Sequence, residues 1–315
     1  MHNASYVSAA DAFAGWKDDV LTGAPPVLYP VADSCSTLSK LEIGPGLVTL
    51  IGGAPGAGKT AFTMQIVVDA LRLNPSLRAV VCNIEMTPAV LLNRQLARLS
   101  GIDLQTIRYR QFEEKHGSRL EAALNTLESI GERLAFCKPP YDLGNVAATA
   151  DRFQASLIVL DYIQRIAPPG EHGDKRGSVD ACMNFIRQFA DYGVAVIVVA
   201  AVSRTKDKQG RSSYDADGLS LASFRESSEL EFGADDAFIL ARTSEQHVLL
   251  KHLKARHSEP FNHLMDFDGA LQRFTPVASS EQGSSSQGSS SQGGRFDVAA
   301  LWRQSDDCEV SPWPL

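Results

Sequence analysis

The chain has 315 residues, 44% of them hydrophobic and 21% charged, and a formal net charge of −7. These proportions are those of an ordinary soluble globular protein, long enough for one or two domains. The negative charge argues against a surface that coats nucleic acid, although it is compatible with a local basic loop. The five cysteines show no C-x-x-C spacing. Because no apolar run is long enough to span a membrane and no charged-then-apolar leader opens the chain, we expect a cytoplasmic protein without a membrane segment.

Residues 1–40 predict a short segment ahead of the main domain. Phe13, Trp16 and Val20 recur at helical spacing, which indicates one amphipathic helix. A proline-containing stretch follows it. We expect this segment to be a linker or docking helix.

A glycine-rich loop follows the first apolar strand. Leu47–Ile51 predicts a buried strand, and a helical apolar pattern begins at Phe62. Between them the pattern G-x-x-x-x-G-K-[ST] is made, up to the next residue Ala61, by Gly53, Ala54, Pro55, Gly56, Ala57, Gly58, Lys59 and Thr60. In such a P-loop the backbone N–H groups and the helix N-terminus bind phosphate, the lysine reaches the β- and γ-phosphates, and the hydroxyl is a Mg²⁺ ligand. The sequence therefore predicts a site for a nucleoside triphosphate and Mg²⁺.

Two carboxylates directly follow apolar strands. Glu85 comes after the predicted strand Arg78–Ile84, and Asp161 comes after the wholly apolar strand Leu157–Leu160. An aspartate at the end of a central strand beside a P-loop can hold Mg²⁺, and hydrolysis also needs a group that activates water. Asp161 is therefore a candidate metal residue and Glu85 a candidate general base. The alternative for both is a solvated carboxylate that merely ends a strand.

The order of the predicted elements indicates an α/β fold. Thr87-Pro88 predicts a helix start, and Ser118-x-x-Glu121 reads as a capping box that opens another helix. Unbroken apolar strands between helices predict a mostly parallel sheet covered on both faces. The strand patterns over residues 238–274 have short connections, including the turn dipeptide Asp268-Gly269, and predict a C-terminal antiparallel β extension.

A basic stretch follows the last central strand, Val194–Ala200. It has no apolar periodicity, and its cations are Arg204, Lys206, Lys208 and Arg211. Such a loop can bind the phosphates of single-stranded DNA in a salt-dependent and largely sequence-independent way. Neighbouring aspartates dilute this charge, so a merely solvated loop is the alternative.

The C-terminal residues predict a tether and a peptide after a main domain that spans 41–277. Residues 278–294 form a near-repeat of Ser, Gln and Gly, which buries too little apolar area to fold and predicts a flexible linker. Residues 295–315 regain apolar side chains among acidic ones. They are a candidate docking peptide for a protein partner, and a disordered end is the alternative.

Several short motifs resemble the C-terminal ATPase domain of DnaB-type replicative helicases. In chain order they are Lys59-Thr60-Ala61-Phe62, Asn83-Ile84-Glu85-Met86, Asp161-Tyr162-Ile163-Gln164, Phe224-Arg225-Glu226-Ser227 with Ala234-Asp235, and Lys254-Ala255-Arg256. One such match alone means little, but their joint order covers about residues 41–277. The resemblance implies a RecA-like P-loop NTPase that hydrolyses ATP with Mg²⁺ and assembles into a homo-oligomeric ring, usually a hexamer.

The resemblance also implies roles for individual residues. Glu85 would be the catalytic base, and Lys254 and Arg256 would project into the ATP site of the next subunit, although both could be ordinary surface charge. The family's loop that contacts single-stranded DNA is matched by Arg225, Glu226 and Ser228. The helix within residues 1–40 could pack on a neighbouring subunit, as the family's linker does, or on its own core.

Two departures from the family affect the functional prediction. Ala201 stands where the family carries a glutamine that is thought to link the γ-phosphate to DNA, and the 40 residues before the core do not match the family's primase-binding domain. We expect a ring-forming, DnaB-like helicase or translocase that acts on single-stranded DNA. The alternatives are a DnaB-related regulatory or assembly ATPase, which switches with nucleotide state and recruits a partner without unwinding, and a recombinase that coats DNA as a filament.

Overall fold

The computed structural model describes residues 7–34, 36–168, 175–202, 205–206, 212–213, 219–224 and 228–277. Residues 28–278 form one compact unit, and the N-terminal helix α1 (Ala9–Thr22) belongs to another. α1 begins after the N-cap Ser8, whose hydroxyl accepts a hydrogen bond from the Asp11 N–H, and it ends at Gly23 in the left-handed conformation. The amphipathic helix predicted near the N-terminus is therefore confirmed. None of the helices in the described part of the chain is long and apolar enough to cross a membrane.

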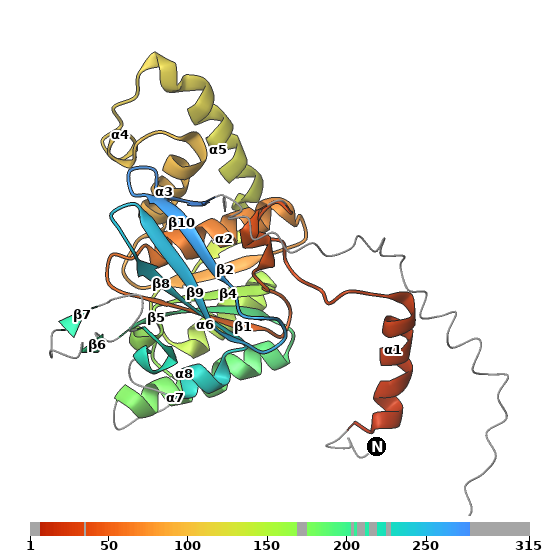
Figure 1. Ribbon diagram of the computed structural model, residues 1–315. Coiled ribbons are helices and arrows are strands. Elements are labelled where there is room, and N and C mark those ends of the chain that lie inside the picture. Colours follow the sequence, from red (N-terminus) through yellow and green to blue (C-terminus); the bar gives the residue numbers. More distant parts are fainter. Residues whose placement is uncertain are drawn as a thin grey trace, which may run out of the picture. The chain divides into compact units, whose positions relative to one another are not determined.

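A nine-stranded sheet forms the centre of the larger unit, in the order β11-β10-β9-β8-β1-β5-β4-β2-β3 (Figure 1). Its strands are β1 (Val48–Gly53), β2 (Ala79–Asn83), β3 (Leu134–Phe136), β4 (Leu157–Asp161), β5 (Ala195–Ala201), β8 (Asp236–Arg242), β9 (His247–Ala255), β10 (Asn262–Asp268) and β11 (Arg273–Pro276). The strands from β8 across to β3 pair in parallel, whereas β8, β9, β10 and β11 pair in antiparallel fashion. The predicted α/β fold with an antiparallel C-terminal extension is confirmed, and β8 is the strand at which the two parts join.

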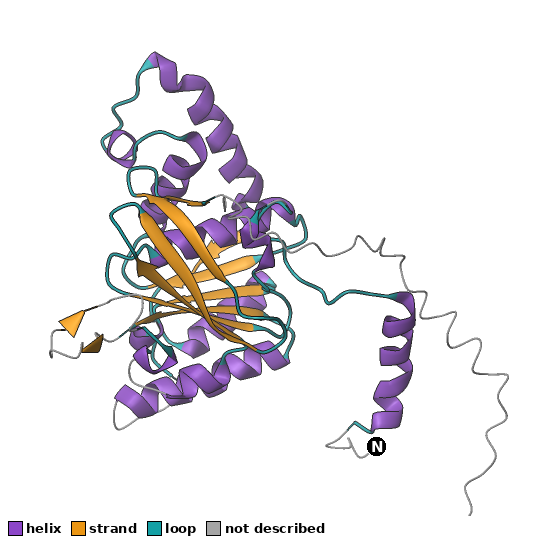
Figure 2. Ribbon diagram, in the orientation of Figure 1, coloured by secondary structure: helices purple, strands orange, loops and turns teal. Residues whose placement is uncertain are grey.

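Helices cover both faces of this sheet (Figure 2). On one face, α2 (Lys59–Leu73), α3 (Pro88–Ser100) and α5 (Gly117–Gly131) contribute to a core that includes Phe62 and Val81. On the other face, α6 (Leu143–Phe153), α7 (Lys175–Asp191) and α8 (Ser228–Gly233) pack on Val80 and Cys82. Val80 and Val81 thus point to opposite faces, and both are fully buried because the parallel strands are covered on both sides.

The remaining elements are short. They are α4 (Leu104–Arg108), the 3₁₀ turns η1 (Thr37–Lys40), η2 (Glu114–His116), η3 (Ile163–Arg165) and η4 (Leu221–Ser223), and the paired strands β6 (Thr205–Lys206) and β7 (Ser212–Ser213).

One local prediction was wrong. The helix α5 begins at Gly117, so Ser118 and Glu121 lie inside it and do not form a capping box. The reason is that the preceding turn η2 runs directly into the helix: His116 already has the helical backbone conformation. The helix start at Thr87-Pro88 is confirmed, with Thr87 at the N-cap and proline in the first turn, although the threonine side chain makes no capping hydrogen bond.

Candidate nucleotide-binding site

A cavity of about 440 Å³ lies where the parallel strands β1, β2, β4 and β5 end. Ligand sites in open parallel sheets characteristically lie at this edge. The predicted residues that line it are Pro55, Gly56, Gly58, Lys59, Thr60, Ala61, Glu85 and Asp161. The other predicted loop residues support its wall: Gly53 is the last residue of β1, the Ala54 carbonyl bonds to Lys59, and Ala57 is buried.

The glycines give the loop its curvature. Gly56 and Gly58 have φ angles of 78° and 89°, a conformation that L-residues with side chains rarely adopt. A Cβ atom on Gly58 would lie 2.7 Å from the Cζ atom of Phe274. Gly58 is also the N-cap of α2, whose first residue is Lys59. The loop therefore turns tightly into a helix N-terminus, where unpaired backbone N–H groups favour an anion.

Lys59 is held at the base of the loop. Its Nζ donates hydrogen bonds to the carbonyl oxygens of Gly53, at 2.7 Å, and Ala54, at 3.0 Å. Burial lowers the pKa of Lys59, and the nearby carboxylates of Asp161 and Glu85 oppose that shift. An ammonium that is partly desolvated in this way interacts strongly with a phosphate that enters the cavity.

Thr60 and Asp161 form a hydrogen-bonded pair across the cavity floor. The Thr60 Oγ1 donates to the Asp161 Oδ2 over 2.7 Å, and the Asn83 Nδ2 donates to the same oxygen, also over 2.7 Å. Burial raises the pKa of Asp161, while the hydrogen bond from Thr60 and the charge of Lys59 act against this. A hydroxyl and a carboxylate oxygen beside a phosphate cradle are the donor set that Mg²⁺ takes from proteins, with phosphate oxygens and waters as its other ligands. The residues present therefore fit this ion.

Glu85 lies on the turn that follows β2. Its side chain is exposed to the cavity, and its backbone N–H donates to the Asn83 Oδ1 over 3.1 Å. The neighbouring strand β4 ends at Asp161, which pairs with Asn83 in register. The sheet thus brings the two predicted carboxylates to one cavity, and their catalytic roles remain predictions.

The structure adds residues to the cavity that sequence reasoning missed. Arg94 reaches it from α3, and burial lowers the pKa of this arginine while Asp161 raises it. Phe267 and Gln272 reach it from the hairpin of β10 and β11. No local pattern marks these residues, because only the docking of a distant helix and hairpin brings them to the loop. Asn83 did carry a signal, since it is a polar residue that ends an apolar strand.

Ala201 also lines the cavity, at the end of β5. The side chain of Gln164 bonds its backbone at both groups: the amide nitrogen donates to the Ala201 carbonyl, and the amide oxygen accepts from the Ala201 N–H, each over 3.2 Å. The backbone at this position is therefore tied to the segment that follows β4.

Lys254 and Arg256 lie outside the cavity of their own subunit. The Lys254 Nζ donates to the carbonyl oxygens of Glu231 and Ala234, at 2.7 and 2.6 Å, near the C-terminal end of α8. The Arg256 guanidinium donates to the Asp235 Oδ1 over 2.6 Å, and its side chain is 44% exposed. Burial lowers the pKa of Lys254, and the charge of Arg256 lowers it further. Their role in a neighbouring site remains a prediction.

Most of the candidate DNA-contacting residues lie outside the described part of the chain, namely Arg204, Lys208, Arg211, Arg225 and Glu226. Of Lys206 and Ser228 only the backbone is described, in β6 and α8. Residues 278–315, which include the predicted linker and docking peptide, also lie outside it.

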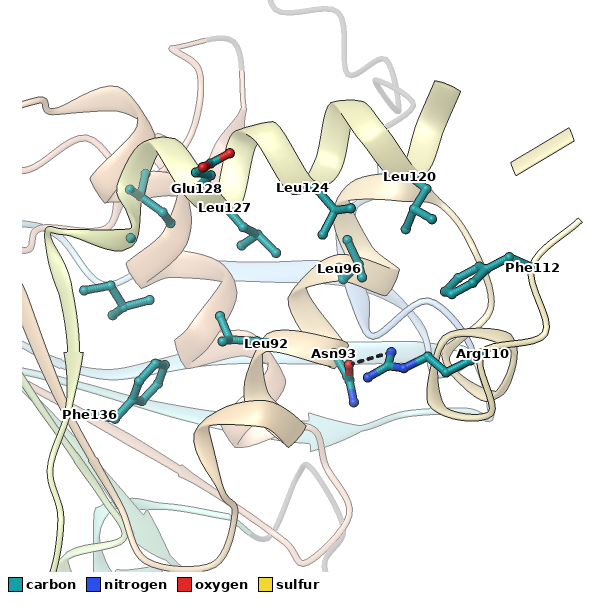
Figure 3. Close-up of a pocket in the computed structure, with 13 residues that line it drawn as sticks. Leu92, Asn93, Leu96, Arg110, Phe112, Leu120, Leu124, Leu127, Glu128 and Phe136 are labelled. Carbon is teal, nitrogen blue, oxygen red and sulfur yellow. Dashed lines mark hydrogen bonds between the residues drawn. The ribbon is translucent and has the colours of Figure 1, made fainter. Parts of the chain in front are cut away.

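A second cavity, of about 650 Å³, lies between α3 and α5 (Figure 3). Its lining is mostly apolar and includes Leu92, Leu96 and Leu124. The one arginine in the lining, Arg110, bonds to the Asn93 Oδ1 over 3.2 Å. An apolar hollow of this kind lacks the N–H cradle and the carboxylates that a Mg²⁺–triphosphate needs, so the cavity beside Lys59 is the candidate nucleotide site.

Comparison with known proteins agrees with this geometry. Residues 41–275 match the DnaB-like helicase C terminal domain family. The chain is a member of the DnaB-like helicase family. Its DnaB-like domain is 21% identical over 252 residues to the replicative DNA helicase DnaB of Buchnera aphidicola subsp. Baizongia pistaciae, covering 75% of this chain and 53% of that protein. It is 23% identical over 210 residues to the DnaB of Buchnera aphidicola subsp. Schizaphis graminum, covering 64% and 44% of the two chains. The chain thus spans about half the length of the curated relatives it matches.

Two solved structures share the fold of the DnaB-like domain. One, an isolated ATPase domain, matches with a TM-score of 0.74 at 17% identity, covering 87% of this chain and 100% of that one. The other, a DnaB-like replicative helicase solved in a study of its interactions with primase, matches with a TM-score of 0.70 at 17% identity, covering 87% and 68%. At this identity the likeness establishes the RecA-like fold that the resemblance implied.

Proposed function

We propose that this chain is a ring-forming, Mg²⁺-dependent ATPase of the DnaB type that moves along single-stranded DNA in the cytoplasm. One observation carries the proposal: a single cavity contains Lys59, the bonded pair of Thr60 and Asp161, and Glu85. A phosphate cradle, a metal-holding pair and a water-activating carboxylate are the parts that hydrolysis of a nucleoside triphosphate requires.

Each of these residues has a defined task in hydrolysis. Lys59 and the backbone N–H groups of residues 53–61 bind the β- and γ-phosphates. Thr60 and Asp161 hold Mg²⁺, which when bound neutralises charge that develops on the transferred phosphoryl group. Glu85 accepts the proton of the attacking water.

The proposed ring completes the site from the next subunit. Lys254 and Arg256 lie outside the cavity of their own subunit, and the Arg256 side chain is 44% exposed, which suits residues that serve an adjoining site. Cations placed at the transferred phosphate stabilise the transition state, so hydrolysis depends on assembly.

The proposed path for DNA uses the segments that follow β5 and η4. The cations of residues 204–211 and the residues Arg225, Glu226 and Ser228 bind backbone phosphates. Support comes from β5, whose last residue, Ala201, lines the nucleotide cavity a few positions before this basic stretch. Binding of single-stranded DNA should therefore weaken steeply with salt.

The regulatory ATPase is a second candidate because of Ala201. This methyl side chain lines the cavity but has no polar group that could connect a γ-phosphate to a DNA loop. In that case nucleotide state would switch the conformation, and residues 295–315 would recruit a protein partner. Deleting residues 279–315 should leave ATP hydrolysis intact under either candidate.

The deciding experiment measures steady-state ATP hydrolysis with and without single-stranded DNA, together with unwinding of a forked duplex. Stimulation by DNA with unwinding supports the helicase, and DNA-indifferent hydrolysis supports the switch. Sedimentation of the purified chain with ATP and Mg²⁺ tests the ring. A monomer that turns over no nucleotide under these conditions would refute the proposal.

A further inference from the structure

Asn83 connects the two carboxylates of the site through one side chain. It is the last residue of β2 and only 6% of it is exposed. Its Nδ2 donates to the Asp161 Oδ2 over 2.7 Å, and its Oδ1 accepts from the backbone N–H groups of Glu85, at 3.1 Å, and Met86, at 2.8 Å. The same planar amide therefore contacts the proposed metal residue and the turn that carries the proposed base.

These contacts go beyond what the backbone already provides. The sheet register pairs Asn83 with Asp161, and the Ile84 N–H donates to the Asp161 carbonyl over 3.1 Å, so the main chains of β2 and β4 are aligned without the side chain. The register does not set the torsion angles of the Asp161 carboxylate or the path of the turn. Both are determined by side-chain hydrogen bonds, from Thr60 and Asn83 to the carboxylate and from the turn to Asn83.

Glu85 depends on this turn for its position. Its side chain is exposed, so few packing contacts hold it, and the direction of its Cα–Cβ bond follows from the backbone. The Asn83 Oδ1 bonds two successive N–H groups of that backbone. An error of about 1 Å in the position of a catalytic group can lower the rate on the order of 100-fold.

Asparagine meets both requirements where its near relatives do not. Its amide has a donor and an acceptor on one rigid plane, whereas an aspartate has only acceptors and would place a second charge beside Asp161. A serine hydroxyl can accept from backbone N–H groups one or two positions ahead, but it is shorter and offers one donor at most.

We propose that Asn83 is a positioning residue that sets the Glu85 turn and the Asp161 carboxylate in a common geometry for ATP hydrolysis. This inference rests on the proposed ATPase function. Asn83 does not touch the reacting atoms, so its loss should lower turnover and Mg²⁺-dependent binding while metal-free nucleotide binding by Lys59 and the loop persists.

The test compares Asn83→Ala with Asn74→Ala. Asn74 makes the same kind of contact outside the site, since its Oδ1 accepts from the Ser76 N–H at 3.1 Å and the Ser76 Oγ at 2.8 Å. For Asn83→Ala we expect kcat to fall on the order of 10- to 100-fold with a KM for ATP within about threefold of the parent. The gain in affinity of a fluorescent ATP analogue on adding Mg²⁺ should shrink several-fold, with metal-free affinity unchanged. Asn74→Ala should leave all of these values unchanged.

Two further variants keep the test decisive if Asn83→Ala unfolds. Asn83→Ser retains an acceptor for the turn and should have an intermediate kcat, and Asn83→Asp should lose most turnover although it matches asparagine in shape. Adding Asn83→Ala to Glu85→Gln should cost little beyond Glu85→Gln alone, because residues that act as a unit are not additive. Parental kcat and Mg²⁺ gain in Asn83→Ala, or fully additive losses in the double variant, would overturn the inference.

Failure of this inference can be distinguished from failure of the proposed function. If Lys59→Ala hydrolyses ATP like the parent, the ATPase assignment itself is wrong. If Lys59→Ala and Glu85→Gln are inactive but Asn83→Ala behaves like Asn74→Ala, only the positioning role is wrong.

Discussion

The side chain of Gln65 brackets the backbone of Phe274, 209 residues away: its Nε2 donates to the Phe274 carbonyl, and its Oε1 accepts from the Phe274 N–H, each over 2.9 Å. Gln65 lies on the P-loop helix α2, and Phe274 lies on β11. The Phe274 ring also packs edge-on against Phe62 and stacks on Phe267, with centroids 5.2 and 4.4 Å apart. The last strand is thus fixed to the helix that follows the phosphate loop.

This packing makes Gly58 intolerant of a side chain. In Gly58→Ala the new Cβ would lie 2.7 Å from a Phe274 ring that is packed on two sides, in a backbone with a φ of 89°. Gly193 has a φ of 82° but open space around it, so Gly193→Ala isolates the cost of the backbone. We expect Gly193→Ala to lower the free energy of unfolding by about 1–2 kcal/mol, and Gly58→Ala to lower it by about 1–3 kcal/mol more. Urea unfolding measures both, and equal losses would show that Phe274 yields freely. Only Gly58→Ala should also weaken ATP binding.

Glu85→Gln should bind ATP but hydrolyse it slowly. The amide cannot accept the proton of the attacking water, so we expect kcat to fall by about 10²- to 10⁴-fold while the affinity for ATP changes little. Glu128→Gln, an exposed site in the α3–α5 cavity, is the matched control and should keep parental activity. Single-turnover hydrolysis and equilibrium nucleotide binding give the two readouts. Near-normal turnover in Glu85→Gln would remove this residue from the mechanism.

Mixing inactive subunits tests the proposed role of Arg256 across an interface. Lys59→Ala impairs the site of its own subunit, and Arg256→Ala should impair the site of the next one. Random mixing should leave roughly a quarter of the sites with both residues intact, because each interface in a ring joins two different surfaces. ATP hydrolysis should therefore recover in this mixture.

The control mixture combines Lys59→Ala with Glu85→Gln. Both changes impair the half of the site that a subunit supplies to itself, so this mixture should stay inactive. Equal activity in the two mixtures would argue that Arg256 does not act on a neighbour.

Asp161→Asn should stabilise the protein while it abolishes hydrolysis. Burial raises the pKa of Asp161 in the folded state above its unfolded value, so the folded state binds the proton more tightly. The stability from this group is present at pH values below its unfolded pKa and is lost as the pH rises through its folded pKa. At neutral pH the charged, buried carboxylate is therefore a cost, which the neutral amide removes.

The measurement is the free energy of unfolding of the parent and of Asp161→Asn, without Mg²⁺, across a range of pH. The variant should be the more stable at neutral pH, and the difference should shrink as the pH falls towards the ordinary pKa of an aspartate, about 4. A difference that grows towards acid pH would contradict the raised pKa.

Local sequence determined the parts of this protein in which chemistry depends on neighbours in the chain. The P-loop could be predicted because strand, glycines, Lys59 and Thr60 are contiguous, and Glu85 and Asp161 because each follows an apolar strand. The alternation of buried strands and helices was sufficient for the parallel sheet, since only a sheet covered on both faces has wholly apolar strands. The capping box at Ser118 was wrong because the turn ahead of it continues into the helix.

Tertiary structure alone decided which distant groups meet at the loop. Arg94, Phe267 and Gln272 follow no motif, and they reach the cavity because α3 packs beside α2 and because Gln65 and Phe274 hold the last hairpin against it. The double contact of Asn83 likewise required the register that sets β2 against β4. Contacts between residues far apart in the chain depend on the sum of packing and hydrogen-bond energies over the whole fold, which no short stretch of sequence contains.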